Sequence, residues 1–104
     1  MRTSNTPDTE LMLLLDRIAA RDEKALRLLY DDTASRLYGL ALRILGNKAW
    51  AEDVLQDSFV AIWHKAGSYR DSLSPPLAWM GMVVRGRALD FLRKRRAERL
   101  DQHA

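Results

Sequence analysis

The sequence of 104 residues contains no cysteine, which excludes a disulfide framework, a thiolate metal cluster and a cysteine nucleophile. No uninterrupted apolar run exceeds five residues, so the sequence predicts no membrane-spanning helix and no membrane partner. The polar N-terminus, residues 1–7, lacks the apolar segment of a secretory signal. From these absences and the short length we expect a cytoplasmic protein with one small domain.

Strand signals are also missing, because nowhere do apolar and polar residues alternate with β-branched enrichment. Helical periodicity runs through almost the whole sequence instead, and it predicts an all-α, compact bundle of about four helices. The first expected helix follows Asp8 or Thr9 as its N-cap, the second follows Asp22, and the third and fourth begin at residues 48 and 75. They end near residues 21, 45, 65 and 100. Their expected boundary residues are Asp22, Asn47 and Ser74 as N-caps, Gly46 and Gly67 as stops, and Pro75 at a first helical position. We further expect a flexible segment at 1–9, one domain at 10–100, and a frayed tail at 101–104 that includes His103.

Charge is distributed unevenly along the chain, whose net charge is +3. Residues 1–84 carry 10 Lys/Arg and 11 Asp/Glu, whereas residues 85–104 carry seven and three. A near-neutral body with a basic end suggests a polyanionic partner at that end. The alternative is a solvated basic helix terminus, which the helix dipole favours without any partner.

The third expected helix bears a polar stripe opposite its apolar side. The stripe consists of Asp53, Gln56, Asp57 and Val60. It can be a solvent-exposed face, or a partner-binding face with Val60 and Trp63 as apolar contacts. A metal site built from Asp53, Asp57 and His64 is a third interpretation, but three ligands on one straight helix cannot converge on one ion. We therefore expect neither a metal nor another cofactor.

Aromatic residues and cations follow one another from the loop after residue 66 into the fourth helix. They are Tyr69, Arg70, Trp79, Arg85, Arg87 and the cluster at 93–96. Rings that stack on bases, beside cations that follow phosphates, are typical of proteins that bind an unpaired nucleic-acid strand. The polar loop could also hold one base taken out of its stack. The role of Trp79 stays undecided at this point, because its side chain can equally pack in the core or accept a partner.

Three segments in order resemble region 2 of bacterial extracytoplasmic-function (ECF) sigma factors, the promoter-recognition subunits of RNA polymerase. The segments are 49–63 (AWAEDVLQDSFVAIW), 77–80 (LAWM) and 87–93 (RALDFLR), with a polar loop between the first two. The family patterns are similar to AEDLxQExFxxxW and WLxxIARNxAxDxLRRxR, and the resemblance covers roughly residues 10–98.

The resemblance implies a promoter-recognition domain of packed helices that catalyses no reaction. It implies that the third helix docks on the clamp coiled coil of the polymerase's largest subunit, through Glu52, Asp53, Gln56, Asp57, Val60 and Trp63. It also implies that the loop from 66 to 74 captures a base flipped from the non-template strand of the −10 element. The implied DNA contacts are Ser68, Tyr69, Arg70, Asp71, Ser72, Trp79, Arg85, Arg87, Arg93, Arg95 and Arg96. An anti-sigma factor that covers the same surfaces is a further implied partner.

The sequence departs from the family pattern in two places. Gly86 stands where the family usually has asparagine, so an amide expected near the promoter strand is missing. The pair Pro75-Pro76 stiffens the exit of the loop. Family members also continue into a helix-turn-helix domain for the −35 element, and we interpret this chain as an isolated region 2 domain without it. The competing interpretation is a helical adaptor that binds a protein and whose basic end is only solvated.

Overall fold

A computed structural model describes residues 6–102, which form four α-helices and one short 3-10 helix with no strand among them. The helices are α1 (Asp8–Ala19), α2 (Glu23–Leu45), α3 (Lys48–Lys65), η1 (Ala66–Ser68) and α4 (Pro76–Gln102). The predicted all-α bundle is therefore confirmed. No helix in this part of the chain is long and apolar enough to cross a membrane.

Three of the expected helix boundaries are confirmed. The carboxylate of Asp22 accepts the backbone N–H groups of Lys24 and Ala25 at 3.0 and 3.4 Å, so it caps α2. The side chain of Asn47 accepts the N–H of Trp50 at 3.0 Å and caps α3. Gly46 ends α2 in the left-handed conformation, with φ of 68°. Glycine reaches this conformation without the clash that a Cβ would cause, which is why it commonly ends helices.

Other boundaries differ from the prediction. Helix α1 begins at Asp8 with Pro7 at the N-cap position, so neither Asp8 nor Thr9 is its cap; both are helical and do not belong to a flexible segment, and the helix ends at Ala19. Helix α4 begins at Pro76, because the residue before a proline disfavours helical backbone and Pro75 is thereby held outside the helix. The carbonyl of Pro75, and not that of Ser74, accepts the first helical bond, from Trp79 N–H at 3.0 Å. Helix α4 also continues to Gln102, whereas residues 1–5 and 103–104 of the predicted mobile ends, including His103, lie outside the described residues.

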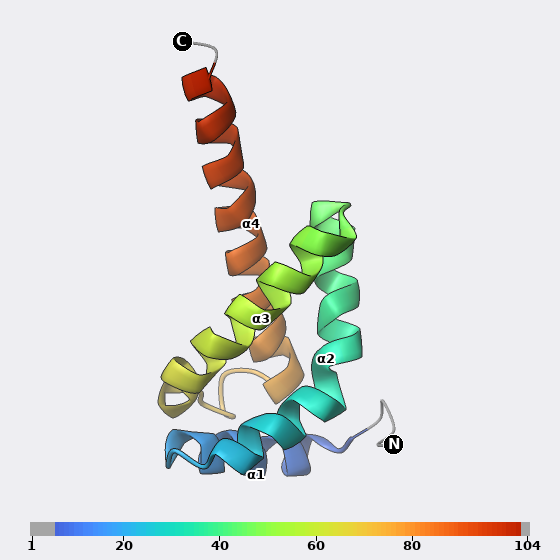
Figure 1. Cartoon of the computed structure of the whole chain (residues 1–104). Coiled ribbons are helices and arrows are strands. Elements are labelled where there is room, and N and C mark those ends of the chain that lie inside the picture. Colours follow the sequence, from blue (N-terminus) through green and yellow to red (C-terminus); the bar gives the residue numbers. More distant parts are fainter. Residues whose placement is uncertain (1–5, 103–104) are drawn as a thin grey trace.

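Each α-helix packs against the other three, and α2 is the central element because its contacts are the most extensive. Figure 1 shows α1 across one end of the bundle and α3 crossing in front of α4. The core takes side chains from every α-helix: Leu11, Leu14, Leu15 and Ile18; Ala25, Leu29, Leu37, Ala41 and Leu45; Ala51, Val54, Leu55, Phe59 and Ile62; and Met80, Val84 and Ala88. The small buried Ser58 fits among them because its hydroxyl donates to the carbonyl of Val54 at 2.6 Å.

The last turns of α4 project beyond the bundle (Figure 1). Residues 93–101 are all exposed, whereas Met80, Val84 and Ala88 in the first half of the helix are buried. This projection contributes to the elongated outline of 50 × 27 × 24 Å. The basic cluster at 93–96 is therefore presented on an exposed part of the helix, beyond the buried core residues of α4.

Candidate functional site

The polar stripe of α3 does not form a single surface, because α3 has a neighbour on each side. Gln56 and Val60 face α2, where an open and mainly apolar groove of about 550 Å³ lies between the two helices. We call this the α2–α3 groove, and it is lined by Glu23, Leu26, Tyr30, Gln56, Phe59, Val60 and Trp63. Val60 is 56% exposed and lies beside Leu26 and Phe59 in the lining of this groove, so it belongs to a continuous apolar surface, the kind of surface that can mark a binding site.

Tyr30 divides the space between α2 and α3. Its ring meets that of Phe59 edge-on, with centroids 4.9 Å apart. Beyond Tyr30 lies a second hollow of about 500 Å³, and Glu52 of the predicted polymerase-binding set lines it with Gln56. Four of the six predicted residues, namely Glu52, Gln56, Val60 and Trp63, therefore lie along one side of α3, next to α2.

Trp63 is held at the end of the α2–α3 groove by an arginine from the turn between α1 and α2. The guanidinium of Arg21 lies over the Trp63 ring at 5.0 Å, and its Nη1 donates to the Trp63 carbonyl at 2.7 Å. Arg21 has a φ of 69°, and a left-handed conformation costs about 1 kcal/mol for a residue with a Cβ. The next residue, Asp22, accepts from Arg17 Nε at 2.9 Å, and this hydrogen bond lowers the pKa of the Asp22 carboxyl.

Asp53 and Asp57 face the opposite neighbour, α4. They line a hollow of about 210 Å³ together with the charged residues Arg87, Asp90 and Lys94. The Asp57 Oδ2 lies 3.7 Å from Arg87 Nε, so a predicted polymerase-binding residue and a predicted DNA-binding residue pair with each other. Both side chains are partly exposed, and such pairs contribute about 0–1 kcal/mol. Among residues 6–102, no three acidic or histidine side chains are grouped to hold a metal, so Asp53, Asp57 and His64 form no such set.

The predicted DNA-binding arginines of α4 differ in their surroundings. Arg93 pairs with Asp90 one turn earlier. Arg95 stacks over Trp50 of α3 at 4.4 Å and over Phe91 at 5.8 Å. Arg85 and Arg96 are exposed. The contact of Arg95 with Trp50 was not foreseen from the sequence, since it joins residues 45 positions apart on two helices.

Tyr69 and Trp79 meet at the base of the loop, with ring centroids 5.5 Å apart and planes tilted by 58°. The Tyr69 hydroxyl donates to the carbonyl of Ser74 at 2.8 Å and closes the loop on itself. Burial, with the nearby charge of Asp71, raises the pKa of Tyr69. Trp79 is half-buried and packs against the core, so its ring has both a structural contact and an accessible part.

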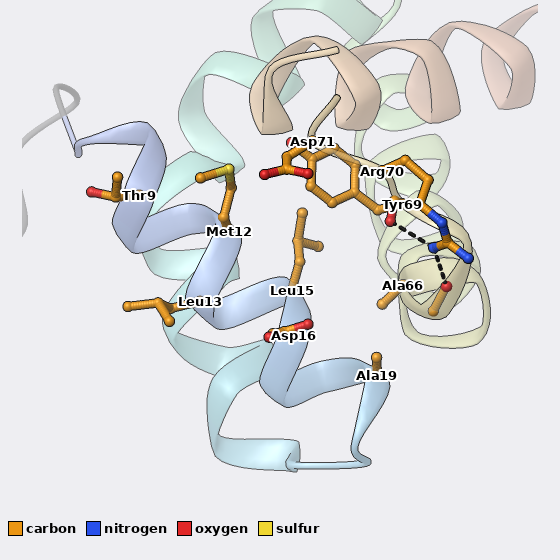
Figure 2. Close-up of a pocket in the computed structure, with 11 residues that line it drawn as sticks. Thr9, Met12, Leu13, Leu15, Asp16, Ala19, Ala66, Tyr69, Arg70 and Asp71 are labelled. Carbon is orange, nitrogen blue, oxygen red and sulfur yellow. Dashed lines mark hydrogen bonds between the residues drawn. The ribbon is translucent and has the colours of Figure 1, made fainter. Parts of the chain in front are cut away.

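The loop forms one wall of a hollow of about 550 Å³, and α1 forms the other (Figure 2). Tyr69, Arg70 and Asp71 line it from the loop, facing Asp16 and Met12 of α1. Arg70 is folded back on the loop, where its Nη1 donates to the carbonyls of Gly67 and Tyr69 at 2.8 and 2.9 Å (Figure 2).

Two predicted loop residues do not line this hollow. The Ser68 hydroxyl donates to the Lys65 carbonyl at 2.7 Å, and Ser72 is exposed outside the hollow. The contribution of α1 was missed by the sequence analysis, because nothing local to α1 indicates that the loop packs over it.

Comparison with known proteins identifies the family. The model for "Sigma-70 region 2" matches residues 29–98. The chain is 38% identical over 89 residues to the ECF RNA polymerase sigma factor SigK of Mycobacterium sp. (strain KMS), covering 86% of this chain and 46% of that protein. It is 35% identical over 88 residues to SigK of Mycolicibacterium vanbaalenii, covering 85% and 45%, and 33% identical over 85 residues to SigK of Mycobacterium bovis (strain BCG / Pasteur 1173P2), covering 82% and 46%.

The chain thus spans about half the length of the curated relatives it matches. The family match includes most of α2, all of α3, the loop and most of α4, but not α1, which forms one wall of the hollow beside the loop. This chain belongs to the sigma-70 region 2 family, as a region 2 domain of the ECF type.

Proposed function

We propose that this domain acts in transcription initiation, in the cytoplasm of a bacterium, by binding core RNA polymerase and by stabilising the melted −10 promoter element. The observation that carries the proposal is the α2–α3 groove with the exposed Val60, in a chain that matches sigma-70 region 2. The domain needs no catalytic group for this role, because it positions RNA polymerase, which is the enzyme, on DNA.

The α2–α3 groove supports a docking function. Its apolar floor, with Glu23 and Gln56 along it and Glu52 in the adjoining hollow, suits a helical partner that presents apolar side chains flanked by cations. The clamp coiled coil of the polymerase's largest subunit is the partner we propose. An anti-sigma factor that occupied the same groove would exclude the polymerase, because one surface cannot bury two partners.

The loop and α4 support a role in binding an unpaired DNA strand. Trp79 and Tyr69 offer aromatic surface, and Arg85 and Arg96 offer exposed cations further along α4. The hollow between α1 and the loop is large enough for a base. In this proposal the non-template strand follows α4 and places one flipped base against the loop.

A pull-down of bacterial core RNA polymerase tests the docking proposal. Val60→Arg places a charge in the apolar part of the α2–α3 groove, and we expect it to weaken polymerase binding about tenfold or more. Val60 is preferable to Asp57 for this test, because an arginine at 57 would face Arg87 and disturb α4 as well.

Leu100→Arg is the matched control, since Leu100 is 64% exposed on α4 far from the groove and the same substitution is made. We expect it to bind polymerase like the unmodified chain. Equal binding by Val60→Arg, or no binding by the unmodified chain, would contradict the docking proposal and favour a helical adaptor with another partner.

A further inference from the structure

The turn between α1 and α2 has the hydrogen bonds of a Schellman motif. The N–H of Asp22 donates to the Arg17 carbonyl at 3.0 Å, and the N–H of Arg21 donates to the Ile18 carbonyl at 2.8 Å. Arg21 therefore occupies the position that is usually glycine, because its backbone must be left-handed. Among residues 6–102, Arg21 is the one non-glycine residue with positive φ.

The side chain of Arg21 explains why a strained residue is kept at this position. It makes two contacts with Trp63, which lies 42 positions away at the end of α3. The hydrogen bond reaches a carbonyl in the last turn of α3, where helices lack intrahelical donors. The stacking contact fixes one face of the Trp63 ring. A glycine would fit the turn without strain and make neither contact.

These contacts end on the α2–α3 groove, because Trp63 lines the groove beside Val60. The turn itself is fixed as well, since Arg17 Nε and Nη2 both lie 2.9 Å from Asp22 Oδ2 and Asp22 caps α2. Helix α2, which forms one side of the groove, thus starts at this turn. Trp63, which lies at the end of the groove, is held by the same turn.

We propose that Arg21 is a positioning residue that holds Trp63 in the conformation required for docking, so that the α2–α3 groove is preorganised before the partner arrives. This inference rests on the proposed docking function. A side chain that is already fixed loses less conformational entropy on binding, so removal of Arg21 weakens binding although Arg21 itself need not touch the partner.

The experiment compares Arg21→Asn with the unmodified chain. Asparagine tolerates the left-handed conformation, so the turn is kept while both contacts with Trp63 are lost. The first measurement is the NMR signal of the Trp63 indole N–H, assigned with Trp63→Phe. We expect this signal to shift and broaden, while those of Trp50 and Trp79 stay in place. The second is the affinity for core RNA polymerase, which we expect to fall about tenfold.

Two further variants distinguish positioning from a purely structural cap. Arg21→Lys keeps the charge and one donor for the Trp63 carbonyl but loses the planar stack, and we expect normal stability with reduced polymerase affinity. Arg27→Asn removes the same charge from an exposed position of α2 and is expected to change neither measurement. Arg21→Gly serves if the asparagine variant unfolds, because glycine relieves the backbone strain.

Each outcome is decisive. An unchanged Trp63 signal in Arg21→Asn would overturn the proposal, as would full polymerase affinity in Arg21→Lys and Arg21→Asn. If the unmodified chain does not bind polymerase, the docking function fails on its own, and the Trp63 signal still decides whether Arg21 fixes that ring.

Discussion

The carboxylate of Asp22 accepts two backbone N–H groups at the start of α2 and also pairs with Arg17 near the end of α1. These contacts favour the ionised form and lower the pKa of Asp22 below its ordinary value of 3.8. A carboxyl whose pKa is lowered by folding stabilises the folded state at pH above that ordinary value. The stabilisation is lost as the pH falls from there through the lowered pKa.

Asp22→Asn separates the capping of α2 from the ion pair with Arg17, because asparagine also caps helices but carries no charge to pair with Arg17. We expect the variant to have a modestly lower free energy of unfolding near neutral pH and no deficit well below pH 3.8. Urea denaturation at both pH values measures this. A deficit that persisted in acid would mean that the geometry of the cap, and not the charge of Asp22, had been lost.

Single residues differ in how far the sequence alone could place them. Asp22, Asn47 and Gly46 were predicted correctly, because caps are decided by neighbours within a few positions. The role of Arg21 could not be predicted, since its partner Trp63 is distant in the sequence and arginine is not the residue expected in a left-handed turn. Local rules placed these three residues but misplaced the starts of α1 and α4, and they give no contacts between helices.

Among the elements, α4 contains a glycine that its packing does not require. A Cβ built on Gly86 meets nothing within 4 Å, and the residue is exposed. Gly86→Ala should therefore raise the free energy of unfolding by about 1 kcal/mol, because alanine has less backbone freedom to lose in a helix. Thermal denaturation followed by circular dichroism measures the change.

Gly46→Ala is the matching comparison for Gly86→Ala. A Cβ on Gly46 also meets nothing within 4 Å, but the backbone of Gly46 is left-handed, with φ of 68°. We expect this variant to lose about 1 kcal/mol, since the left-handed conformation is costly for alanine. Stabilisation by both substitutions would mean that backbone conformation does not distinguish the two glycines.

Helix α3 shows why the candidate site was only partly predictable. A helical wheel places Gln56, Val60, Asp53 and Asp57 on one side, opposite the core, and that side was predicted correctly as exposed. The wheel does not show that α2 and α4 flank this side. The structure divides the stripe between them, so that Val60 faces the α2–α3 groove and Asp57 pairs with Arg87. The roles of all these residues in binding stay predictions.

For the whole molecule, the separation of charge predicts how DNA binding responds to salt. Each phosphate that the domain neutralises on a single strand contributes about −0.7 to the slope of log affinity against log salt. Arg85→Ala and Arg96→Ala remove exposed cations of α4 and should each reduce the slope by about that amount. Fluorescence anisotropy with a single-stranded −10 oligonucleotide measures it.

Arg27→Ala, which removes the same charge from α2, should leave the slope unchanged. A slope that responds equally to all three substitutions would show that only net charge matters and that α4 is not the path of the strand. A flat response of the unmodified chain would contradict DNA binding by this domain.

The projecting end of α4 has a consequence for local unfolding. Residues 93–101 are exposed, and apart from the stacking of Arg95 over Trp50 their helical shape depends on hydrogen bonds within the helix. Arg95 and Arg99 also repel each other one turn apart. Amide hydrogens there should exchange with solvent without any opening of the core, and faster toward the C-terminus. A bound polyanion would remove the repulsion and slow that exchange. Binding of a polyanion would therefore raise the helical order of this end of the domain, whereas the order of the bundle depends on its core.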